Sequence, residues 1–284
     1  MRQFVLEKQS VKNGLIILDG KDFRYIHNVL RAKVGDMVCV RLQNGTLENT
    51  TVARIDEKAR KLTLQICSTQ VTAGQVFAGD LQSSGSITRG VQTAQSEQTL
   101  SSVEYWLFQF VPKPVKMEQI VRQAVECGIS VIVPVIGEYS QKSSITAIEG
   151  SKKERFERII KEARQQSGSP IDTKVLSPMT LAEAVKLWNE NLQGCNETDR
   201  NLSNLALVLS ERSDCKKTFK EIIADSCSVK KVCIAVGSEG GISPEEICYL
   251  EEKGMFQAVH FAVNILRCET AALYGIAAVQ AAIG

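Results

Sequence analysis

The chain has 284 residues, of which 44% are hydrophobic and 23% are charged. These values are ordinary for folded globular proteins and exclude a mostly disordered or fibrous chain. No apolar run reaches the roughly 18 residues that a membrane-spanning helix needs, and the first residues lack the apolar core of a signal peptide. We therefore expect a cytoplasmic protein that does not act at a membrane.

The nine cysteines are odd in number, scattered, and include no Cys-x-x-Cys pair. Most lie in apolar segments such as Val232-Cys233-Ile234, where a reduced cysteine packs as a small hydrophobic residue. The two histidines, His27 and His260, are too few to build a clustered set of zinc ligands with these cysteines. We expect neither disulfides nor a metal site.

The first 72 residues are basic and rich in short predicted strands. They carry 12 lysines and arginines against seven acids, whereas the remainder carries 22 against 25. This charge is compatible with nucleic-acid contact and equally with no special partner. Strands are predicted at 14–18, 37–42, 50–55 and 61–66, with a short helix at 22–29. Strands at this spacing indicate a small barrel.

A polar stretch separates this basic unit from the rest of the chain. Residues 71–101 are dominated by Gly, Ser, Thr and Gln, which is typical of a linker or an extended surface insertion. A second polar stretch, at 189–204, predicts a loop. We therefore divide the chain into a barrel at 1–72, a polar linker or insertion at 73–101, and a second domain at 102–284.

From residue 103 strands and helices alternate, which predicts a parallel or mostly parallel sheet covered on both faces. In the first helix Met117, Ile120, Val121, Ala124 and Val125 recur at helical spacing, and Gly128 follows in the position of a left-handed cap. The predicted strands are 103–111, 129–135, 205–209, 231–236 and 258–262. The further predicted helices are 152–166, 180–190, 216–224, 244–253 and 268–282.

A Gly-rich turn, Gly237-Ser238-Glu239-Gly240-Gly241, follows one of the buried strands. The next helix has a well-specified start, with Ser243 as N-cap, Pro244 at the first helical position and Glu246 completing a capping box. Such a turn presents backbone groups at the carboxyl end of a strand, where open α/β sheets bind ligands. It matches neither the dinucleotide fingerprint nor a P-loop, so both a ligand loop and an ordinary tight turn fit the pattern.

Close to the C-terminus, Arg267, Glu269 and Thr270 interrupt a run of small and apolar residues. The helix that follows is rich in alanine and contains Gly275. We expect its backbone to pack very close to a neighbouring element. An amphipathic terminal helix with a helix-stabilising glutamate fits the same residues.

Two further polar segments are ambiguous on their own. Residues 162–170, Glu-Ala-Arg-Gln-Gln-Ser-Gly-Ser-Pro, fit a solvated helix end and a turn. Residues 25–36 fit a short basic helix before a strand, in which Arg31 and Lys33, together with the preceding Arg24, are candidates for phosphate contacts.

Together these segments resemble the ribosomal RNA small subunit methyltransferase E family of the SPOUT superfamily, whose members methylate N3 of a uridine in 16S rRNA. The resemblance is carried by His27-Asn28-Val29-Leu30-Arg31 with Gly35-Asp36, by the strand-to-helix entry at Lys113, by the Gly237–Gly241 turn, and by Ile265-Leu266-Arg267-Cys268-Glu269-Thr270-Ala271. The last two segments, in tandem, are specific.

The resemblance implies a PUA-like N-terminal β-barrel and a C-terminal SPOUT α/β domain with a deep trefoil knot, an exception to the rule that chains do not thread loops. It also implies that S-adenosyl-L-methionine (SAM) binds in the knot, held mainly by backbone groups of Leu209-Ser210-Glu211, the Gly-rich turn and residues 261–270. The implied SAM-binding residues are Leu209, Ser210, Gly237, Glu239, Gly240, Gly241, Phe261, Val263, Ile265, Leu266, Arg267 and Thr270.

The implied reaction needs neither a metal nor a covalent intermediate, because a sulfonium methyl group is already electrophilic. The enzyme must align uracil N3 with the methyl group and remove the N3 proton. We predict catalytic roles for Arg267, which would stabilise the uracil anion or position a phosphate, and for Glu269, which would orient Arg267.

The implied partners are 16S rRNA or the small ribosomal subunit, presenting an unstacked base, and a second copy of the chain in a homodimer. Residues that we predict to contact RNA are Arg24, His27, Arg31, Lys33, Lys113 and Arg164.

The chain departs from the family pattern in four places. Ser238 stands where the family usually has Pro, Ser169 where it has Arg, and Gln141-Lys142 where an Arg is expected, and the 71–101 stretch is longer than the usual junction. Arg164, one helical turn before Ser169, is a candidate substitute. The alternatives are a SPOUT enzyme for another RNA position or a ribose 2′-OH, and a non-catalytic RNA-binding or assembly protein, which SAM affinity would distinguish.

Overall fold

The computed structural model describes residues 3–6, 11–42, 45–67, 103–149, 152–192, 203–210, 218–224 and 229–283. Its internal contacts define two compact units. Residues 1–9, 38–48 and 103–284 form the larger unit, and residues 10–37 and 49–102 the smaller one. The predicted linker at 73–101, Glu211 and most of the polar stretch at 189–204 lie outside the described residues. The division at 72 and 102 stays a prediction.

The smaller unit is built from antiparallel strand pairs. β2 (Val11–Lys12) pairs with β3 (Leu15–Leu18), β3 with β6 (Lys61–Ile66), and β6 with β5 (Leu47–Asp56). The helix predicted at 22–29 is α1 (Gly20–Arg24), continued by a π-helical turn, η1 (Tyr25–Val29). Strand β2 was not predicted, because a two-residue strand carries too little pattern to be detected.

In the larger unit, β1 (Gln3–Val5) pairs in parallel with β4 (Met37–Arg41). The main sheet has the strand order β10-β8-β7-β12-β11-β13, with β9 beside β8, and all its pairs are parallel. Its strands are β7 (Glu104–Phe110), β8 (Val131–Ile136), β9 (Lys174–Val175), β10 (Met179–Thr180), β11 (Asn204–Leu209), β12 (Lys231–Val236) and β13 (Gln257–Val259). The predicted mixed α/β fold with a parallel sheet is confirmed.

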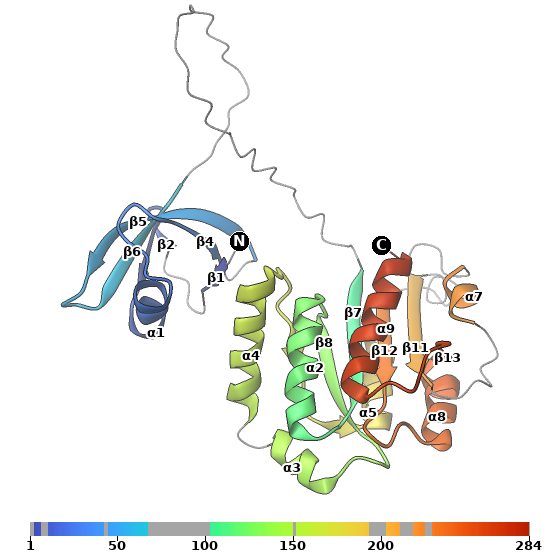
Figure 1. Cartoon of the computed structure of the whole chain (residues 1–284). Coiled ribbons are helices and arrows are strands. Elements are labelled where there is room, and N and C mark those ends of the chain that lie inside the picture. The colour runs from blue at the N-terminus through green and yellow to red at the C-terminus, as the bar shows by residue number, and fades with distance from the viewer. Residues whose placement is uncertain are drawn as a thin grey trace, which may run out of the picture. The chain divides into compact units, whose positions relative to one another are not determined.

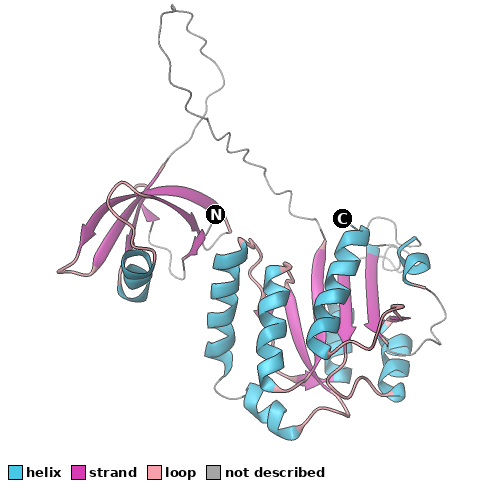
Figure 2. Ribbon diagram, in the orientation of Figure 1, coloured by secondary structure: helices cyan, strands magenta, loops and turns pink. Residues whose placement is uncertain are grey.

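Helices cover both faces of this sheet (Figure 2). The apolar cluster on one face includes side chains of α2 (Pro114–Glu126), α3 (Lys142–Glu149), α4 (Lys152–Ser167), α7 (Phe219–Ala224) and α9 (Cys268–Ile283). The cluster on the other face includes α5 (Leu181–Asn191) and α8 (Pro244–Gly254). Among the described residues, no helix is long and apolar enough to cross a membrane.

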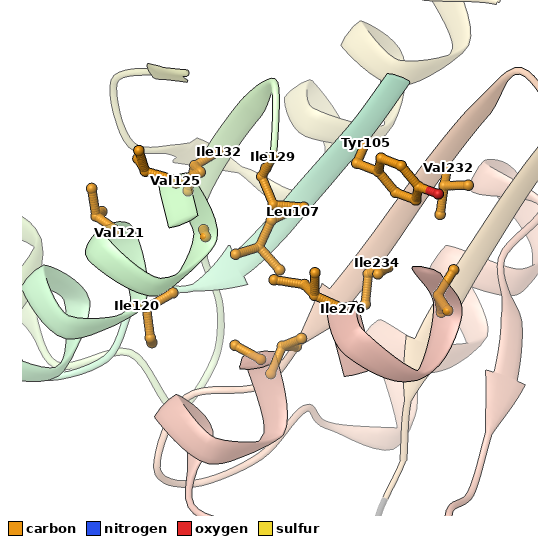
Figure 3. Packing of buried hydrophobic residues seen from close by; sticks show 14 of the residues in the cluster. Tyr105, Leu107, Ile120, Val121, Val125, Ile129, Ile132, Val232, Ile234 and Ile276 are labelled. Carbon is orange, nitrogen blue, oxygen red and sulfur yellow. The ribbon is translucent and has the colours of Figure 1, made fainter. Parts of the chain in front are cut away.

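Packing in the hydrophobic core places helices α2 and α9 next to each other on one face of the sheet (Figure 1). Leu107 of β7 and Ile234 of β12 pack with Ile120 of α2 and Ile276 of α9, all nearly inaccessible to solvent (Figure 3). Burying such side chains stabilises the fold by about 1.5–3 kcal/mol each. This packing fixes the first turns of both helices near the carboxyl ends of β7 and β12.

One predicted strand needs correction, and one helix was missed. The strand predicted at 258–262 ends at Val259, whose carbonyl accepts a hydrogen bond from the Ser210 N–H, and residues 260–267 form a loop. Helix α3 was not predicted, because it lies in a short segment with a weak apolar face, KSSITAIE.

Candidate functional site

The Gly-rich turn after β12 is closed on itself by a backbone bridge between Ser238 and Gly241. A Cβ atom at Gly237 would lie 2.7 Å from the carbonyl carbon of Gly241, so only glycine fits there. Gly241 has a φ of 82°, a conformation that side chains rarely adopt. A Cβ atom at Gly240 would meet Tyr139 at 2.7 Å, so Gly240 packs against the loop after β8. The turn is therefore tightly built around its backbone.

The elements on either side hold this turn in place. Ser243 and Glu246 form the predicted capping box at the start of α8, and Glu246 Oε1 also accepts a hydrogen bond of 2.8 Å from the Glu138 N–H. Gln109, buried at the end of β7, donates to the carbonyl oxygens of Val236 and Gly237 at 3.3 and 3.0 Å. Sequence reasoning missed Gln109, because its contact bridges segments far apart in the chain.

Helix α9 passes close to the end of β11. A Cβ atom at Gly275 would lie 2.5 Å from Leu209 Cδ1, which confirms the predicted close packing of this small-residue helix. The helix starts at Cys268, directly after the loop that carries Arg267. The ends of β11 and β12 and the loop before α9 thus meet at one edge of the sheet.

These three segments line a cavity of about 330 Å³. All predicted cofactor-binding residues line it except Gly240, which packs on Tyr139, and Thr270, which is exposed. Three further lining residues, Ser238, Asn264 and Cys268, lie within the predicted segments. The remaining ones lie outside them and were not predicted: Lys116, Val236, Ile242, Ile247, His260, Ala271 and Tyr274. Backbone groups and apolar side chains dominate the wall, as in sites that bind a small organic ligand.

The charged side chains at this cavity centre on Lys116, in the first turn of α2. Its Nζ lies 3.1 Å from Glu269 Oε2, 3.7 Å from Glu239 Oε1 and 3.9 Å from Cys268 Sγ. The Lys113 N–H donates to both carboxylate oxygens of Glu239, at 3.2 and 3.3 Å. The sequence analysis selected Lys113 as a functional lysine and missed Lys116. The sequence around Lys116, next to the buried Met117, does not indicate that Glu239 and Glu269 lie beside it.

The protonation states follow from these contacts. Burial acts to raise the pKa of Glu269, but hydrogen bonds from its own backbone N–H, from Lys116 and from Cys268 bring the pKa below its ordinary value. The hydrogen bond to Glu269 raises the pKa of Lys116. Burial raises the pKa of the Cys268 thiol to about 12. At neutral pH the group therefore holds one ammonium, an ionised Glu269 and a protonated thiol.

Arg267 and Glu269 do not pair as predicted. The Glu269 carboxylate contacts Lys116 and Cys268, whereas the exposed Arg267 has no ion-pair partner among the described residues. The two residues sit on either side of the buried Cys268, which explains why their side chains diverge. Glu269 therefore fixes the start of α9 and does not orient the Arg267 guanidinium.

The predicted RNA-contact residues are distributed over both units. Arg24, Arg31, Lys33 and Lys113 are exposed, and His27 is half-buried, with Nδ1 2.9 Å from Asn28 Oδ1. Arg164 differs: it is only 8% exposed and its guanidinium donates to Asp172 and to the Pro170 carbonyl oxygen. The nearby Ser169 is also buried. Arg164 thus lies in a structural network rather than on an open surface.

The six cysteines in the described part of the chain are free thiols. The described residues contain no group of three or more His, Cys, Asp or Glu side chains arranged to hold a metal ion. The polar groups at the cavity include backbone N–H and C=O groups and the side chains of Lys116, Glu239, Arg267 and Glu269.

Comparison with known proteins assigns the larger unit to a family. Residues 99–280 match the family model of the RNA methyltransferase domain, which is more than half of the chain. The chain belongs to the RNA methyltransferase family. The matched region contains all three segments that line the cavity.

Within the RNA methyltransferase family, the resemblance stated from sequence is confirmed. The chain is 31% identical over 182 residues to ribosomal RNA small subunit methyltransferase E of Aquifex aeolicus, covering 62% of this chain and 67% of the relative. It is 25% identical over 282 residues to ribosomal RNA small subunit methyltransferase E 2 of Borreliella burgdorferi, covering 98% and 96%.

A solved structure shares the fold. The ribosomal RNA small subunit methyltransferase E from Neisseria gonorrhoeae, bound to S-adenosyl methionine, is 22% identical, with a TM-score of 0.69 and coverage of 99% of this chain and 97% of that one. At 22% identity, this similarity establishes only that the two chains share a fold.

Proposed function

We propose that this protein transfers a methyl group from SAM to N3 of a uridine in the 16S rRNA of the small ribosomal subunit. The observation that carries the proposal is the cavity at the carboxyl edge of the sheet, walled by the Gly-rich turn, Leu209-Ser210 and residues 261–267. It lies within the part of the chain that matches the RNA methyltransferase family, whose relatives here carry the name ribosomal RNA small subunit methyltransferase E.

The residues of the cavity fit SAM. The backbone at Gly237 comes so close to Gly241 that no side chain would fit, which leaves N–H and C=O groups to face a ligand. Ile242, Ile247 and Phe261 supply apolar wall for a flat adenine ring, and Glu239 supplies negative charge for a cationic cofactor. We assign SAM binding to the predicted residues that line the cavity, with Arg267 contributing through its backbone and not its side chain.

SAM, when bound, supplies an electrophilic methyl group. The chain must then orient the uracil and stabilise negative charge on the ring as the N3 proton leaves. Arg267 suits this role because its exposed guanidinium lies at the cavity wall without an ion-pair partner among the described residues. Glu269 contributes by holding, through Lys116, the first turn of the helix that follows Arg267.

For RNA binding we propose Arg24, Arg31, Lys33 and Lys113, which are exposed, and the half-buried His27. Basic side chains of this kind contact phosphates, while the target base is unstacked to reach the cavity. Arg164 would support the fold of the larger unit instead of contacting RNA, because it is buried against Asp172. We also propose a cytoplasmic location, where a protein acting on small ribosomal subunits would meet its substrate.

We also infer a PUA-like barrel for the N-terminal part and a deep trefoil knot in the SPOUT domain. The antiparallel pairs β2-β3-β6-β5 support the barrel. The close approach of Gly275 to Leu209 supports the knot, because a helix threaded past the end of β11 has room only for small residues there.

We further infer a homodimer. Large apolar side chains are exposed around the cavity: Val115 at the start of α2, Ile265 in the loop before α9 and Tyr274 on α9, at 78%, 82% and 41%. A second copy covering them would remove this apolar surface from water. Light scattering at a concentration of tens of micromolar should give twice the chain mass of 31.2 kDa, and a strictly monomeric mass would contradict the dimer.

The test of the function is transfer of a labelled methyl group from SAM to small ribosomal subunits that lack their own uridine-N3 mark, followed by mass spectrometry of the nucleosides. Labelled 3-methyluridine is the expected product. Label in another base or in a 2′-O-methyl ribose would reassign the target. SAM binding without any transfer to subunits or to free 16S rRNA would favour a non-catalytic RNA-binding protein.

A further inference from the structure

Lys116 links the two chain segments that flank the cavity, and the proposed reaction gives it no contact with the reacting groups. Its Nζ lies 3.1 Å from Glu269 Oε2, at the start of α9, and 3.7 Å from Glu239 Oε1, in the Gly-rich turn. Lys116 itself comes from a third element, the first turn of α2. One ammonium group therefore connects three segments that lie far apart in the sequence.

Glu239 is also held from a second direction. The Lys113 N–H donates to both of its carboxylate oxygens, at 3.2 and 3.3 Å. Lys113 is the N-cap residue of α2, and its own side chain makes no capping hydrogen bond. Glu239 thus caps α2 from another segment, where the helix dipole favours a negative charge. The Gly-rich turn is thereby fixed to α2 through one side chain.

The charge balance of this group depends on Lys116. Two carboxylates lie within 3.7 Å of its Nζ, and the Glu269 side chain is only 11% exposed. Glu239 is more open to water, with 30% of its side chain exposed. Without the ammonium, the two carboxylates would lose the cation that they share, and their mutual repulsion would favour separation of the segments that carry them.

We propose that Lys116 is a positioning residue of the cofactor site. It acts through Glu239 and Glu269 to hold the Gly-rich turn and the residues before α9 at the spacing that SAM requires. This inference rests on the proposed function, because it takes the cavity as the SAM site. In this role Lys116 sets the affinity for SAM and leaves the chemical step unchanged.

The first test compares SAM binding and turnover in four proteins: wild type, Lys116→Met, Lys116→Arg and Arg122→Met. Arg122 is an exposed residue of the same helix outside the cavity, so Arg122→Met is the matched control for loss of one positive charge. Lys116→Met should bind SAM about tenfold more weakly, since small displacements of positioning groups have effects of this size or larger. Lys116→Arg, which keeps the charge, should stay within about threefold of wild type, and Arg122→Met should match wild type.

The kinetic parameters separate positioning from direct catalysis. For Lys116→Met the KM for SAM should rise with its Kd, while kcat at saturating SAM stays within about threefold of wild type. Unchanged SAM affinity in Lys116→Met would overturn the proposal. A collapse of kcat with wild-type SAM affinity would also overturn it, since Lys116 would then act on the RNA substrate.

A double-mutant cycle tests the route through Glu269. If Lys116 acts through this carboxylate, the double variant Lys116→Met with Glu269→Gln should bind SAM no more weakly than Lys116→Met alone, because the uncompensated charge has been removed. Fully additive losses would show that the two residues act independently and would contradict the proposal.

Amide hydrogen exchange of the protein without SAM provides a readout that does not depend on the cofactor. Residues 237–241 and 264–271 should exchange faster in Lys116→Met than in wild type, with protection restored in Lys116→Arg. Unchanged exchange would overturn the role of Lys116 even in a protein that binds SAM. If the wild-type protein does not bind SAM, while Lys116→Met still exchanges faster than wild type at these residues, the role of Lys116 stands and the proposed function is contradicted instead.

Discussion

At the scale of single residues, the site is made mostly of backbone, and its few charged side chains are largely paired with one another. Gly237 and Gly241 bring the turn onto itself, while Lys116, Glu239 and Glu269 form one ion-pair group. Among the described residues this leaves Arg267 as an exposed cation at the cavity without an ion-pair partner. A side chain that is not held by the fold is the one most readily used on a substrate.

Arg267→Ala should therefore separate catalysis from cofactor binding. We expect kcat to fall by about 100-fold, the usual effect of removing one group that stabilises developing negative charge. The Kd for SAM should change by less than about threefold, because backbone groups hold the cofactor. Arg267→Lys, which keeps the charge but not the planar fork, should recover part of the rate.

Single-turnover methyl transfer and calorimetric titration of SAM give the two quantities for each variant. Full turnover in Arg267→Ala with SAM still bound would remove Arg267 from the mechanism. Loss of SAM binding in Arg267→Ala would make it a cofactor ligand instead.

Residue-level interactions could be predicted where they are local. The capping box of Ser243 and Glu246 and the left-handed Gly128 depend on neighbours within a few residues, and the structure has them as the sequence indicates. The Lys116–Glu269 pair and the Gln109 hydrogen bonds to the turn could not be predicted. They join segments that come together only when the parallel sheet forms, and a single sequence holds no record of that pairing.

At the scale of secondary structure elements, helix starts position the site. Helix α8 begins with the capping box of Ser243 and Glu246, directly after the Gly-rich turn, and helix α5 begins with an equivalent capping box of Thr180 and Glu183, at the end of β10. Ile242 and Ile247, on either side of the α8 start, line the cavity. The α8 capping box therefore links helix stability to the shape of the cavity, whereas the α5 capping box does not.

Ser243→Ala and Thr180→Ala form a matched pair that tests this link. Each should lower the free energy of unfolding by about 1 kcal/mol, because each removes one N-cap oxygen. Only Ser243→Ala should also weaken SAM binding. Chemical denaturation measures the first quantity and calorimetry the second. Equal SAM affinities in the two variants would show that the turn keeps its shape without the α8 cap.

The elements themselves were predictable because their patterns are strong. The strand over 231–236 and the helices that begin at Lys152, Leu181 and Pro244 lie within a residue or two of their predicted positions. The short strands β1, β2, β9 and β10 were missed, since two or three residues carry no measurable alternation. The end of β13 was misplaced because the apolar residues after it line the cavity instead of joining the sheet.

At the scale of the whole molecule, two compact units divide the proposed functions. The larger unit contains the cavity and every residue that lines it. The smaller unit carries Arg24, Arg31 and Lys33, all exposed, near the π-helical turn η1. RNA affinity and SAM affinity should therefore respond to different substitutions.

Replacing Arg24, Arg31 and Lys33 together by alanine should weaken binding to 16S rRNA and leave the Kd for SAM unchanged. The slope of log K for RNA binding against the logarithm of the salt concentration should also become shallower, by roughly 0.7–0.9 for each phosphate contact that is lost. Filter binding over a range of salt concentrations measures both effects. A variant with Lys58 and Lys61, exposed residues of the same unit, replaced by alanine is the control. Equal losses in both variants would indicate diffuse attraction rather than a defined RNA surface.

The site assignment depends most directly on Gly237. A Cβ atom there would lie 2.7 Å from the Gly241 carbonyl carbon, so Gly237→Ala must open the turn that walls the cavity. Calorimetric titration of SAM should give one site per wild-type chain and at least a roughly tenfold weaker Kd for Gly237→Ala. Cys248→Ala, an exposed change on α8 outside the cavity, should match wild type. Wild-type affinity in a folded Gly237→Ala protein would contradict the assignment of this cavity as the SAM site.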